Sequence, residues 1–442
     1  MPESLLTRAV SLIDDAIVAV SSPPGRGAVG IVRLSGTPDR LAPILHGLMG
    51  DAVHRLRDRR LGLVDVLDRD DVLDRALAVR FEGPRSYTGE DVVELHLHGN
   101  PALLSAVVDR ACVLGARVAG PGEFTRRAVA NGRVDLLEAE AIDALIRAES
   151  LDAAKIVRRH LDGELQNSLS LMRDALVEVA AALEASVDFP EEIEVHELMP
   201  DLARLAPVRD RLARLEASFV AGRRLVEGVR VVLSGPVNAG KSTLFNALLG
   251  HERAIVSEHP GTTRDVVSET VVWEGIPVRL EDTAGVRDAV DPVEVVGIQR
   301  SRAARDVADV IIEVRDGRGP LEAEGLRVAT RADGLDTERL EELRAAGWIP
   351  SSPEDVEAVR RAVVDSCRRD APTGVLLHTS RQRDAVRRAV QALDRGVEVG
   401  LDEPVLAALA IRDAGRALEE LVGRWIDESV LDRLFERFCI GK

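Results

Sequence analysis

The chain has 442 residues, of which 45% are hydrophobic and 30% charged, and its formal net charge is −17. One compact core rarely grows to this size, so we expect a soluble globular protein of two to four domains. The negative charge and the aromatic content of 2% argue against broad nucleic-acid binding, so an RNA substrate would need a basic surface on a partner or on a local patch.

The N-terminus and the cysteines indicate a cytoplasmic protein with no membrane partner. Residues 1–13 lack the basic start and long apolar stretch of a signal peptide, and no apolar run is long enough to cross a bilayer. Cys112, Cys367 and Cys439 are far apart and odd in number, which indicates neither a disulfide framework nor a zinc site. We expect the thiols to be reduced.

The first third of the chain alternates short apolar runs with turns that contain glycine or proline. These runs are Ala16–Val20, Val29–Leu34, Ala76–Phe81 and Val92–His98. The pattern is typical of a small α+β domain. Gly25, Gly27 and Gly30 match the spacing of a dinucleotide fingerprint, but a strand-like run follows them where a helix is required, which excludes the Rossmann interpretation.

Two later regions show apolar residues at helical spacing, from about Leu136 to Phe219 and from Ser380 to Phe438. One stripe in the first region comprises Leu161, Leu165, Leu169, Met172, Leu176, Val179 and Leu183. Asp188-Phe189-Pro190 interrupts the first region, because proline cannot continue a helix. We interpret the two regions as one helical domain that an inserted domain divides, since the ends of an inserted domain lie close together.

Between the helical regions, short β-rich runs alternate with helical segments, as in a doubly wound sheet. The runs are Val229–Ser234, Val278–Asp282 and Val310–Val314. The predicted domains are therefore 1–132 (N-terminal), 133–225 (helical, first part), 226–375 (nucleotide-binding) and 376–442 (helical, second part).

Residues 235–242 read Gly-Pro-Val-Asn-Ala-Gly-Lys-Ser, which satisfies the P-loop pattern G-x-x-x-x-G-K-[ST] between a strand and an apolar helix. Backbone N–H groups of such a loop converge on phosphates, its lysine meets the β- and γ-phosphates, and its serine ligates magnesium. We expect the nucleotide contacts Asn238, Ala239, Gly240, Lys241, Ser242 and Thr243.

Further segments follow in the order that a GTPase requires. Gly261-Thr262-Thr263-Arg264-Asp265 supplies a switch threonine, Thr263, for magnesium. Asp282-Thr283-Ala284-Gly285 supplies an outer magnesium aspartate and a glycine for the γ-phosphate. Together with the P-loop, these segments favour a GTPase over a general ATPase.

Thr330-Arg331-Ala332-Asp333 occupies the place of the guanine-reading N-K-x-D motif. Its aspartate accepts from guanine and rejects adenine, whereas the Asn and Lys of the motif are replaced here. We therefore expect guanine specificity with weaker binding. Ser351-Ser352 is either a shortened last base-contacting loop or plain linker.

The residue that orients the attacking water is not the usual one. Val286 stands where Ras-type enzymes place glutamine. Glu294 offers a carboxylate, although Asp291-Pro292-Val293-Glu294 also has the pattern of a helix start with a capping box. Position alone leaves both interpretations open.

Taken together, these segments resemble the MnmE (TrmE) family of tRNA modification GTPases across the whole chain. The segments that carry the resemblance, besides those of the GTPase, are Ala16–Gly36, Tyr87–Glu94, Pro121–Ala128 and Phe438-Cys439-Ile440-Gly441-Lys442. The resemblance implies a Ras-like P-loop GTPase domain inserted in a helical domain and preceded by an α+β folate-binding N-terminal domain.

The resemblance also implies a reaction and its partners. Working with the flavoprotein MnmG, which alone carries FAD, the family installs a carboxymethylaminomethyl or aminomethyl group on C5 of the wobble uridine, U34, of certain tRNAs. The one-carbon unit comes from tetrahydrofolate in its 5,10-methylene or 5-formyl form. The family forms a constant homodimer, its G domains meet during the GTP cycle, and it joins MnmG in a heterotetramer-type complex through which tRNA is mainly contacted.

In the G domain, the resemblance places a potassium ion where other GTPases use an arginine finger, and Glu294 at the catalytic glutamate that orients water. The potassium positions are Asn238, Ser257, His259 and Thr262. The implied switch-loop nucleotide contacts are Ser257, Glu258, His259, Pro260, Gly261, Thr262 and Thr263.

Arg33, Glu94, Arg133 and Lys442 match the family's folate contacts, with Arg133 where a lysine is common. Basic groups suit the folate glutamate tail, and a carboxylate suits the amino edge of the pterin. The alternatives left open are a solvated side chain for Arg33 or Arg133, a strand ion pair for Glu94 and a disordered tail for Lys442. Cys439 matches a cysteine near the folate, but with no adjacent base in the sequence, packing or partner contact ranks above catalysis.

Two other functions fit part of the sequence. A ribosome-assembly GTPase switch would explain the P-loop but not the N-terminal segments or the final Cys-Ile-Gly-Lys, and a folate-dependent transferase regulated by GTP would not need MnmG. His96 and His98 alternate on one strand face like a metal pair, but without a third ligand at useful spacing we interpret them as surface or hydrogen-bonded histidines.

Overall fold

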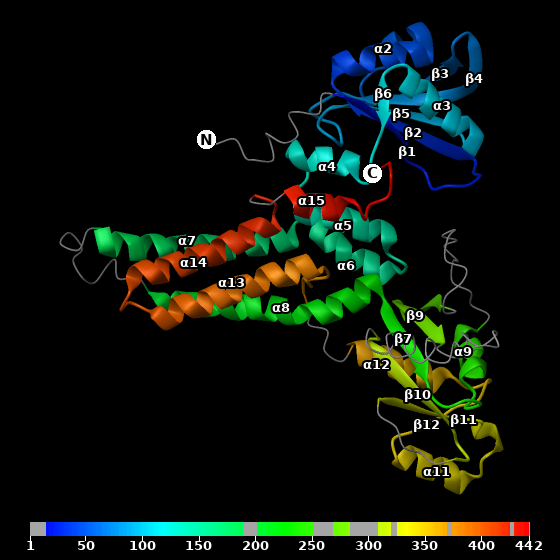
Figure 1. Cartoon of the computed structure of the whole chain (residues 1–442), viewed down its shortest axis with the longest axis vertical. Helices are drawn as coiled ribbons and strands as arrows, with labels where there is room; N and C mark the ends of the chain where they lie inside the picture. Colours follow the sequence, from blue (N-terminus) through cyan, green and yellow to red (C-terminus); the bar gives the residue numbers. More distant parts are fainter. Residues whose placement is uncertain are drawn as a thin grey trace, which may run out of the picture. The chain divides into compact units, whose positions relative to one another are not determined.

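The computed structural model describes residues 15–188, 201–250, 268–282, 308–319, 325–368, 374–424 and 428–441 (Figure 1). The chain divides into two compact units, one made of Met1–Asp143 with Gly415–Lys442 and the other of Ala144–Ala414. The boundaries of these units fall within the two predicted helical parts, 133–225 and 376–442, and the four-part division expected from the sequence stays a prediction.

A six-stranded sheet dominates the first unit. Its strands are β1 (Ala16–Val20), β2 (Val29–Gly36), β3 (Gly62–Asp68), β4 (Asp71–Phe81), β5 (Asp91–His98) and β6 (Ala116–Val118), in the order β3-β4-β5-β2-β1-β6. β1 and β6 run parallel, and the other neighbours pair antiparallel. The third glycine, Gly30, lies inside strand β2, where a Rossmann turn would lead into a helix, so the exclusion of a Rossmann turn there is confirmed.

The two faces of this sheet differ because side chains alternate along each strand. Val32, Leu34, Val93 and Leu95 belong to a buried core that also contains residues of helices α2 (Pro38–Met49) and α3 (Pro101–Val113). The residues between them on β2 and β5 point the other way, and these include the polar side chains of the candidate folate site. A 3₁₀ helix, η1 (Gly50–Arg55), follows α2 directly.

The end of the chain returns to the first unit. Helix α15 (Glu428–Phe435) packs through Leu431 and Phe435 with residues of α5 (Leu136–Arg147), which begins in this unit. Ile440 pairs with Pro121 in an antiparallel bridge, and the Gly122 N–H, just before α4 (Glu123–Ala130), donates to the Cys439 carbonyl at 3.2 Å. The C-terminal segment is thus fixed beside β1 and α4.

Long helices form one part of the second unit. They are α6 (Leu151–Leu161), α7 (Glu164–Asp188), α8 (Leu205–Glu227, after the 3₁₀ turn η2 at Leu202–Arg204), α13 (Ser380–Val399) and α14 (Pro404–Leu421). The apolar stripe is buried along α7 from Leu165 to Leu183. Leu161, however, belongs to α6, because Gly163 takes a positive φ of 77° and separates the two helices. The stripe identified in the sequence is therefore divided between two helices.

Helices from before and after the inserted domain pack together, as predicted (Figure 1). Arg387 of α13 pairs with Glu216 of α8 at 2.8 Å, and Arg209 of α8 pairs with Asp394 of α13 at 3.0 Å. Helices α8 and α13, one from each sequence region of helical spacing, therefore pack against each other.

The inserted domain contains a second six-stranded sheet. Its strands are β7 (Val229–Ser234), β8 (Ser268–Trp273), β9 (Ile276–Asp282), β10 (Val310–Asp316), β11 (Leu326–Thr330) and β12 (Ile349–Pro350), in the order β12-β11-β10-β7-β9-β8. Its helices are α9 (Lys241–Leu249), η3 (Ala332–Gly334), α11 (Thr337–Ala345) and α12 (Glu357–Arg368). β8 runs antiparallel to β9, and the other pairs are parallel.

The predicted doubly wound sheet is confirmed. β7 lies between β9 and β10, so the strand order reverses at β7. Ligands of such sheets bind beyond the carboxyl ends of the strands at this reversal. The P-loop, which follows β7, is therefore at the expected place for a ligand.

Candidate functional site

The P-loop between β7 and α9 has a backbone that its glycines make possible. Gly235 has a φ of 148°, and a Cβ there would collide with the Val314 carbonyl oxygen. Gly240 has a φ of 85°, and its added Cβ would lie 3.1 Å from Thr330 Oγ1. Asn238 also adopts a positive φ, 63°. These conformations curl the loop tightly ahead of α9, so its N–H groups can converge on an anion together with the helix N-terminus.

Lys241 begins α9 and is only 8% exposed. Its ammonium donates to the carbonyl oxygens of Gly235 at 2.9 Å and Pro236 at 2.8 Å. The positive charge therefore lies within the curl of the loop, where a P-loop lysine meets β- and γ-phosphates. Ala239 is buried in the loop, and Thr243 is exposed in the first turn of α9.

The two described residues expected around magnesium lie together. Ser242 Oγ donates to Asp282 Oδ2 at 2.9 Å, joining the start of α9 to the carboxyl end of β9. Asp282 is 4% exposed. A serine hydroxyl backed by a buried carboxylate is a hard oxygen donor set, which fits a magnesium ion bound with phosphates and water.

Thr330 joins the base-reading segment to the P-loop. Its hydroxyl lies 2.6 Å from the Ala239 carbonyl oxygen and 3.1 Å from that of Arg315, so one proton is shared between two acceptors. Arg331 has a φ of 60°, and its guanidinium donates to Asp316 Oδ2 at 2.8 Å and to the Asn238 carbonyl oxygen at 3.3 Å. Both replacements in the motif thus hold the segment against the P-loop, in line with the local bonding expected for Thr330.

The remainder of the base-reading segment lies beside the Ser351-Ser352 stretch. The Ala332 N–H donates to the Ser351 carbonyl at 3.2 Å, and Asp333 is exposed in η3. Ser351 Oγ donates to the Asp355 carbonyl at 3.0 Å, while Ser352 and Asp355 exchange backbone hydrogen bonds. The structure therefore brings Ser351 to the base-reading segment, and its contact with guanine stays a prediction.

Several predicted site residues lie outside the described part of the chain, and their roles stay predictions. They are Ser257, Glu258, His259, Pro260, Gly261, Thr262, Thr263, Thr283, Ala284, Gly285, Glu294 and Lys442.

A second cluster of predicted residues lies on the polar face of the first sheet. Arg33 and Glu94 are direct neighbours across β2 and β5. Glu94 Oε1 accepts from Arg33 Nε at 2.9 Å and lies 2.8 Å from Arg33 Nη2. Arg33 Nη1 also donates to the Gly441 carbonyl at 3.4 Å, and Ser21 Oγ donates to the same carbonyl at 3.0 Å. The strand ion pair considered from the sequence is therefore present, and the C-terminal segment reaches it.

Two aromatic rings lie close to the Arg33 guanidinium. Its central carbon lies 5.8 Å from the Tyr87 ring centre and 5.7 Å from that of Phe124. Burial raises the pKa of Tyr87, whose hydroxyl is hydrogen-bonded to Thr125 at 2.8 Å. A planar cation close to two aromatic rings and beside a carboxylate can recognise a flat heteroaromatic group.

Arg133 and Cys439 contact segments next to this cluster, Ser86 and Gly122 respectively. Arg133 Nε donates to the Ser86 carbonyl at 3.2 Å, next to Tyr87. Cys439 is exposed and is held through its carbonyl by Gly122. Of the four predicted folate residues, the structure pairs Arg33 with Glu94 and places Arg133 on the neighbouring segment.

Sequence reasoning missed His96 as a neighbour of Glu94. His96 Nε2 lies 3.3 Å from Glu94 Oε2, whereas His98 Nδ1 lies 2.8 Å from Asp74 Oδ1. The two histidines therefore face different carboxylates rather than a shared metal. The signal was available, because residues two apart on a strand share a face.

An ionic network supports the start of α4, behind the cluster. Arg127, 3% exposed, contacts the carboxylates of Asp15, Glu90 and Glu123. Burial alone would raise the pKa of Glu123, but hydrogen bonds from Arg117 and the Gly120 N–H outweigh it and lower that pKa. The network keeps Glu123 ionised and fixes the helix to which the C-terminal segment attaches.

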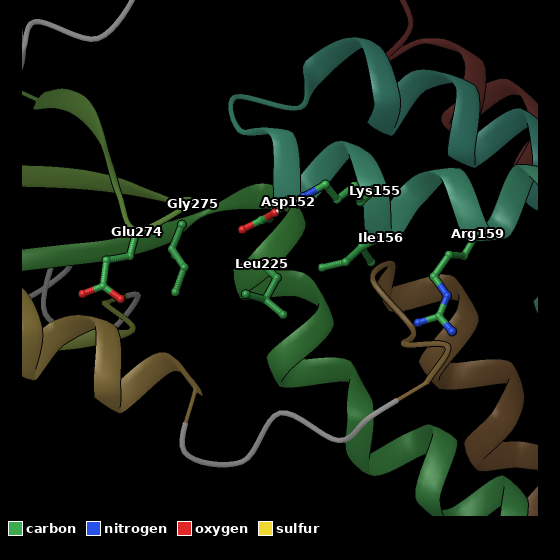
Figure 2. A pocket seen from close by; sticks show the side chains of 8 residues that line it. Asp152, Lys155, Ile156, Arg159, Leu225, Glu274 and Gly275 are labelled. Atoms are coloured by element: carbon green, nitrogen blue, oxygen red, sulfur yellow. Dashed lines mark hydrogen bonds and ion pairs between the residues drawn. The ribbon is translucent and has the colours of Figure 1, made fainter.

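A separate cavity of about 310 Å³ lies in the second unit (Figure 2). Its lining combines apolar and charged side chains from α6, α8 and the β8–β9 turn, namely Asp152, Lys155, Ile156, Arg159, Leu225, Glu274, Gly275 and Ile276. None of the predicted site residues lines it. Gly275, with a φ of 84°, lies so close to Asp152 that an added Cβ would collide with the carboxylate. The turn between β8 and β9 is thus packed tightly against α6.

Comparison with known proteins gives matches along almost the whole chain. Residues 16–133 match the family model described as GTP-binding protein TrmE N-terminus, and residues 136–439 match the MnmE helical domain. The chain is 37% identical to the tRNA modification GTPase MnmE of Nitrosomonas europaea, covering 97% of this chain and 99% of that protein. It is 39% identical to the protein of the same name from Thermus thermophilus, covering 97% and 100%.

Among solved structures, the G domain of the T. maritima FeoB iron transporter is 25% identical to this chain, with a TM-score of 0.24, over 32% of this chain and 99% of that one. Among the described residues, no helix combines the length and apolar character needed to cross a membrane.

Proposed function

The chain belongs to the MnmE family of tRNA modification GTPases and is therefore a GTP hydrolase that acts in tRNA modification, and we propose that potassium and dimerisation stimulate its hydrolysis. In this proposal it works with MnmG, which carries the FAD, to add a carboxymethylaminomethyl or aminomethyl group to C5 of U34. A tetrahydrofolate derivative donates the one-carbon unit.

One observation carries the proposal. The chain has a second polar site besides the P-loop, where Arg33 of the first sheet donates to both Glu94 and the Gly441 carbonyl. A GTPase that serves only as an assembly switch needs no such site. A folate donor does need one, because it offers a pterin amino edge and anionic carboxylates to be bound.

In the G domain, the chain's own residues position and neutralise the phosphates. Lys241 and the loop N–H groups bind the phosphate oxygens, while Ser242 and Asp282 are placed to hold magnesium directly and through water. Thr330 keeps the base-reading segment in register with the loop, which leaves exposed Asp333 to accept from guanine. The bound magnesium and potassium ions would supply positive charge to the phosphate chain.

Asn238 is the described residue that supports potassium. It has a positive φ at the tip of the P-loop and carries a neutral amide oxygen, a ligand type suited to a monovalent cation. Val286 supplies no amide for the attacking water, so the proposal assigns that role to Glu294.

In the first unit, Arg33 and Glu94 would bind the folate jointly. Both Arg33 bonds fall on Glu94 Oε1, so Oε2, which contacts only His96 among the contacts described above, is the oxygen better placed to accept from a pterin amino group. Glu94 thereby orients the ring, and the basic side chains favour the glutamate tail.

The direct test is nucleoside analysis of tRNA from a strain that lacks this chain. We expect wobble uridine to lose its C5 substituent and to regain it when the wild-type chain is restored. Arg33→Ala should fail to restore the substituent while keeping GTP hydrolysis, and Lys241→Ala should lose both. Normal wobble uridine in the deletion strain would overturn the proposal in favour of a ribosome-assembly switch.

The partner and the cation are tested separately with purified protein. Modification in the absence of MnmG would instead support a free-standing transferase. Hydrolysis should be faster in potassium chloride than in sodium chloride at equal ionic strength, and Asn238→Ala should remove most of that difference. Equal rates in the two salts would contradict potassium stimulation.

A further inference from the structure

Two histidines and an aspartate that have no role assigned above converge where α2 ends. His46 lies in the last turn of α2, and Asp51 and His54 lie in η1. The ligand atoms of the three side chains all lie within 4.8 Å of one another, and all three residues are exposed. The two imidazole rings are 6.4 Å apart at an interplanar angle of 46°.

The backbone, rather than chance rotamers, brings these residues together. Gly50 ends α2 with a positive φ of 53°, and its N–H donates to the His46 carbonyl. The 3₁₀ helix starts at that same glycine, so the chain turns sharply between the two elements. Buried Met49 and Leu56 anchor the turn on both sides in the core of the sheet. The corner formed by the end of α2 and the start of η1 is therefore fixed, and its three exposed side chains lie close together.

The donor set selects a class of ion. Two imidazole nitrogens and one carboxylate oxygen suit zinc and its neighbours among the divalent transition metals, whereas magnesium and calcium prefer oxygen ligands alone. Zinc bonds of about 2.0–2.1 Å place tetrahedral ligand atoms about 3.3 Å apart. Exposed side chains on a fixed corner can close from 4.8 Å to that spacing by rotation about their own bonds.

We propose that His46, Asp51 and His54 form a surface site for a divalent transition-metal ion of the zinc class. Three protein ligands leave one tetrahedral position to water, and the bound ion ties the end of α2 to η1. The site is independent of the nucleotide and folate sites and of the proposed tRNA reaction.

The test is a zinc titration of the full-length, nucleotide-free chain by isothermal calorimetry. A Cys439→Ser background removes the exposed thiol that would compete for zinc. We expect His46→Asn, Asp51→Asn and His54→Asn each to weaken one zinc equivalent by at least tenfold. His98→Asn is the matched control, an exposed histidine of the same unit beside a carboxylate, and should bind zinc like the background protein. Circular dichroism checks that each variant is folded.

A second measurement locates the ion. Zinc should slow amide hydrogen exchange in residues 46–56, magnesium at the same concentration should not, and His54→Asn should abolish the effect. Unchanged affinity in all three ligand variants, an equal loss in His98→Asn, or unchanged exchange in residues 46–56 would each overturn the proposal and leave the two rings as a simple contact.

Discussion

Thr330 connects two loops of the nucleotide site through one hydroxyl group. It lies at the end of β11 and supplies its proton to main-chain carbonyls of the P-loop and of β10. The residue is 7% exposed, so water cannot easily replace the lost donor. The threonine that stands in place of the usual asparagine therefore joins the base-reading segment to the P-loop by a hydrogen bond.

We expect Thr330→Val to destabilise the G domain by about 1–3 kcal/mol, because the isosteric change leaves buried carbonyls without their donor. Guanine nucleotide affinity should fall as well, since the base-reading segment loses its tie to the P-loop. Thermal denaturation and titration with a fluorescent GDP analogue measure the two effects. Thr337→Val, at an exposed threonine of α11, is the control, and equal behaviour of the two variants would refute the link.

At Arg33 the expected effect is on ligand binding more than on stability. Arg33→Lys keeps the charge but loses the planar fork that holds Glu94. We expect affinity for 5-formyltetrahydrofolate to fall about tenfold or more, with little change in the unfolding midpoint, because partly exposed ion pairs contribute about 0–1 kcal/mol.

Calorimetric titration with the folate measures the loss. Arg75→Lys, which alters another cross-strand ion pair with Asp65 in the same sheet, should bind folate like wild type. If Arg33→Lys bound folate normally, the pair would have only a structural role.

At the scale of elements, the β8–β9 turn shows why one glycine is required. Gly275 has both a positive φ and no room for a Cβ beside Asp152 of α6. Gly347 has a φ of 78° with nothing within 4 Å of an added Cβ. A substitution at Gly347 therefore reports backbone strain alone, whereas one at Gly275 reports strain together with a steric conflict.

We expect Gly347→Ala to cost about 1 kcal/mol from backbone strain alone, and Gly275→Ala to cost more because the turn must also move off α6. Adding Asp152→Ala to Gly275→Ala should restore the extra stability lost through the steric conflict, but not the stability lost through backbone strain. Denaturant unfolding of the single and double variants measures this, and equal costs at the two glycines would show that the turn does not press on α6.

The element α4 makes the first unit sensitive to acid. The folded-state pKa values of Glu123 and Asp15 lie below their ordinary values, although burial acts in the opposite direction. Their contribution to stability is thus fully present above the ordinary carboxyl pKa and is lost as the pH falls through the lowered folded values.

We expect the unfolding midpoint of the wild-type chain to fall as the pH drops from about 5 towards 3, and Glu123→Gln to be destabilised at pH 7 with a shallower dependence. Thermal scans across this range measure both. Glu82→Gln controls for removing one exposed negative charge in the same unit. An identical pH dependence in Glu123→Gln and wild type would count against the network.

Sequence patterns located helices and strands well where a motif such as the P-loop, or a clear apolar periodicity, marked them. The predicted strand Val229–Ser234 has the bounds of β7, because this valine-rich run ends at the P-loop glycine. β12 has two residues and leaves no detectable pattern, and Gly163 divided a helical stripe that looked continuous because apolar spacing persists across the break.

The candidate sites were predictable as sets of residues but not as contacts. Motif spacing identified Ser242 and Asp282, whereas the pairing of Arg33 with Glu94 depends on strand register between β2 and β5, which no local pattern encodes. The corner of His46, Asp51 and His54 was missed because α2 ends at Gly50 and a 3₁₀ helix follows, so helical spacing does not relate the three.

At the scale of the whole molecule, the segment near residue 441 completes a site built from the first strands. Gly441 has a φ of 94°, and an added Cβ there would collide with the Val20 carbonyl. We expect Gly441→Ala to displace the C-terminal segment and reduce tRNA modification several-fold while GTP hydrolysis persists. Modification and hydrolysis are assayed on the same preparation. Gly115→Ala, at a positive φ with open space, is the control, and parallel losses of both activities would contradict the separation.

The discontinuous first unit also imposes a delay during synthesis. Residues up to 143 belong with residues from 415 onward, and residues 144–414 are made in between. At about 5–20 residues per second, a ribosome needs roughly 15–50 seconds for that interval. For that time Leu136 and Ala139 lack the phenylalanines of the C-terminal segment that cover them. The start of α5 must therefore stay soluble with this apolar surface uncovered until the C-terminal segment has been made.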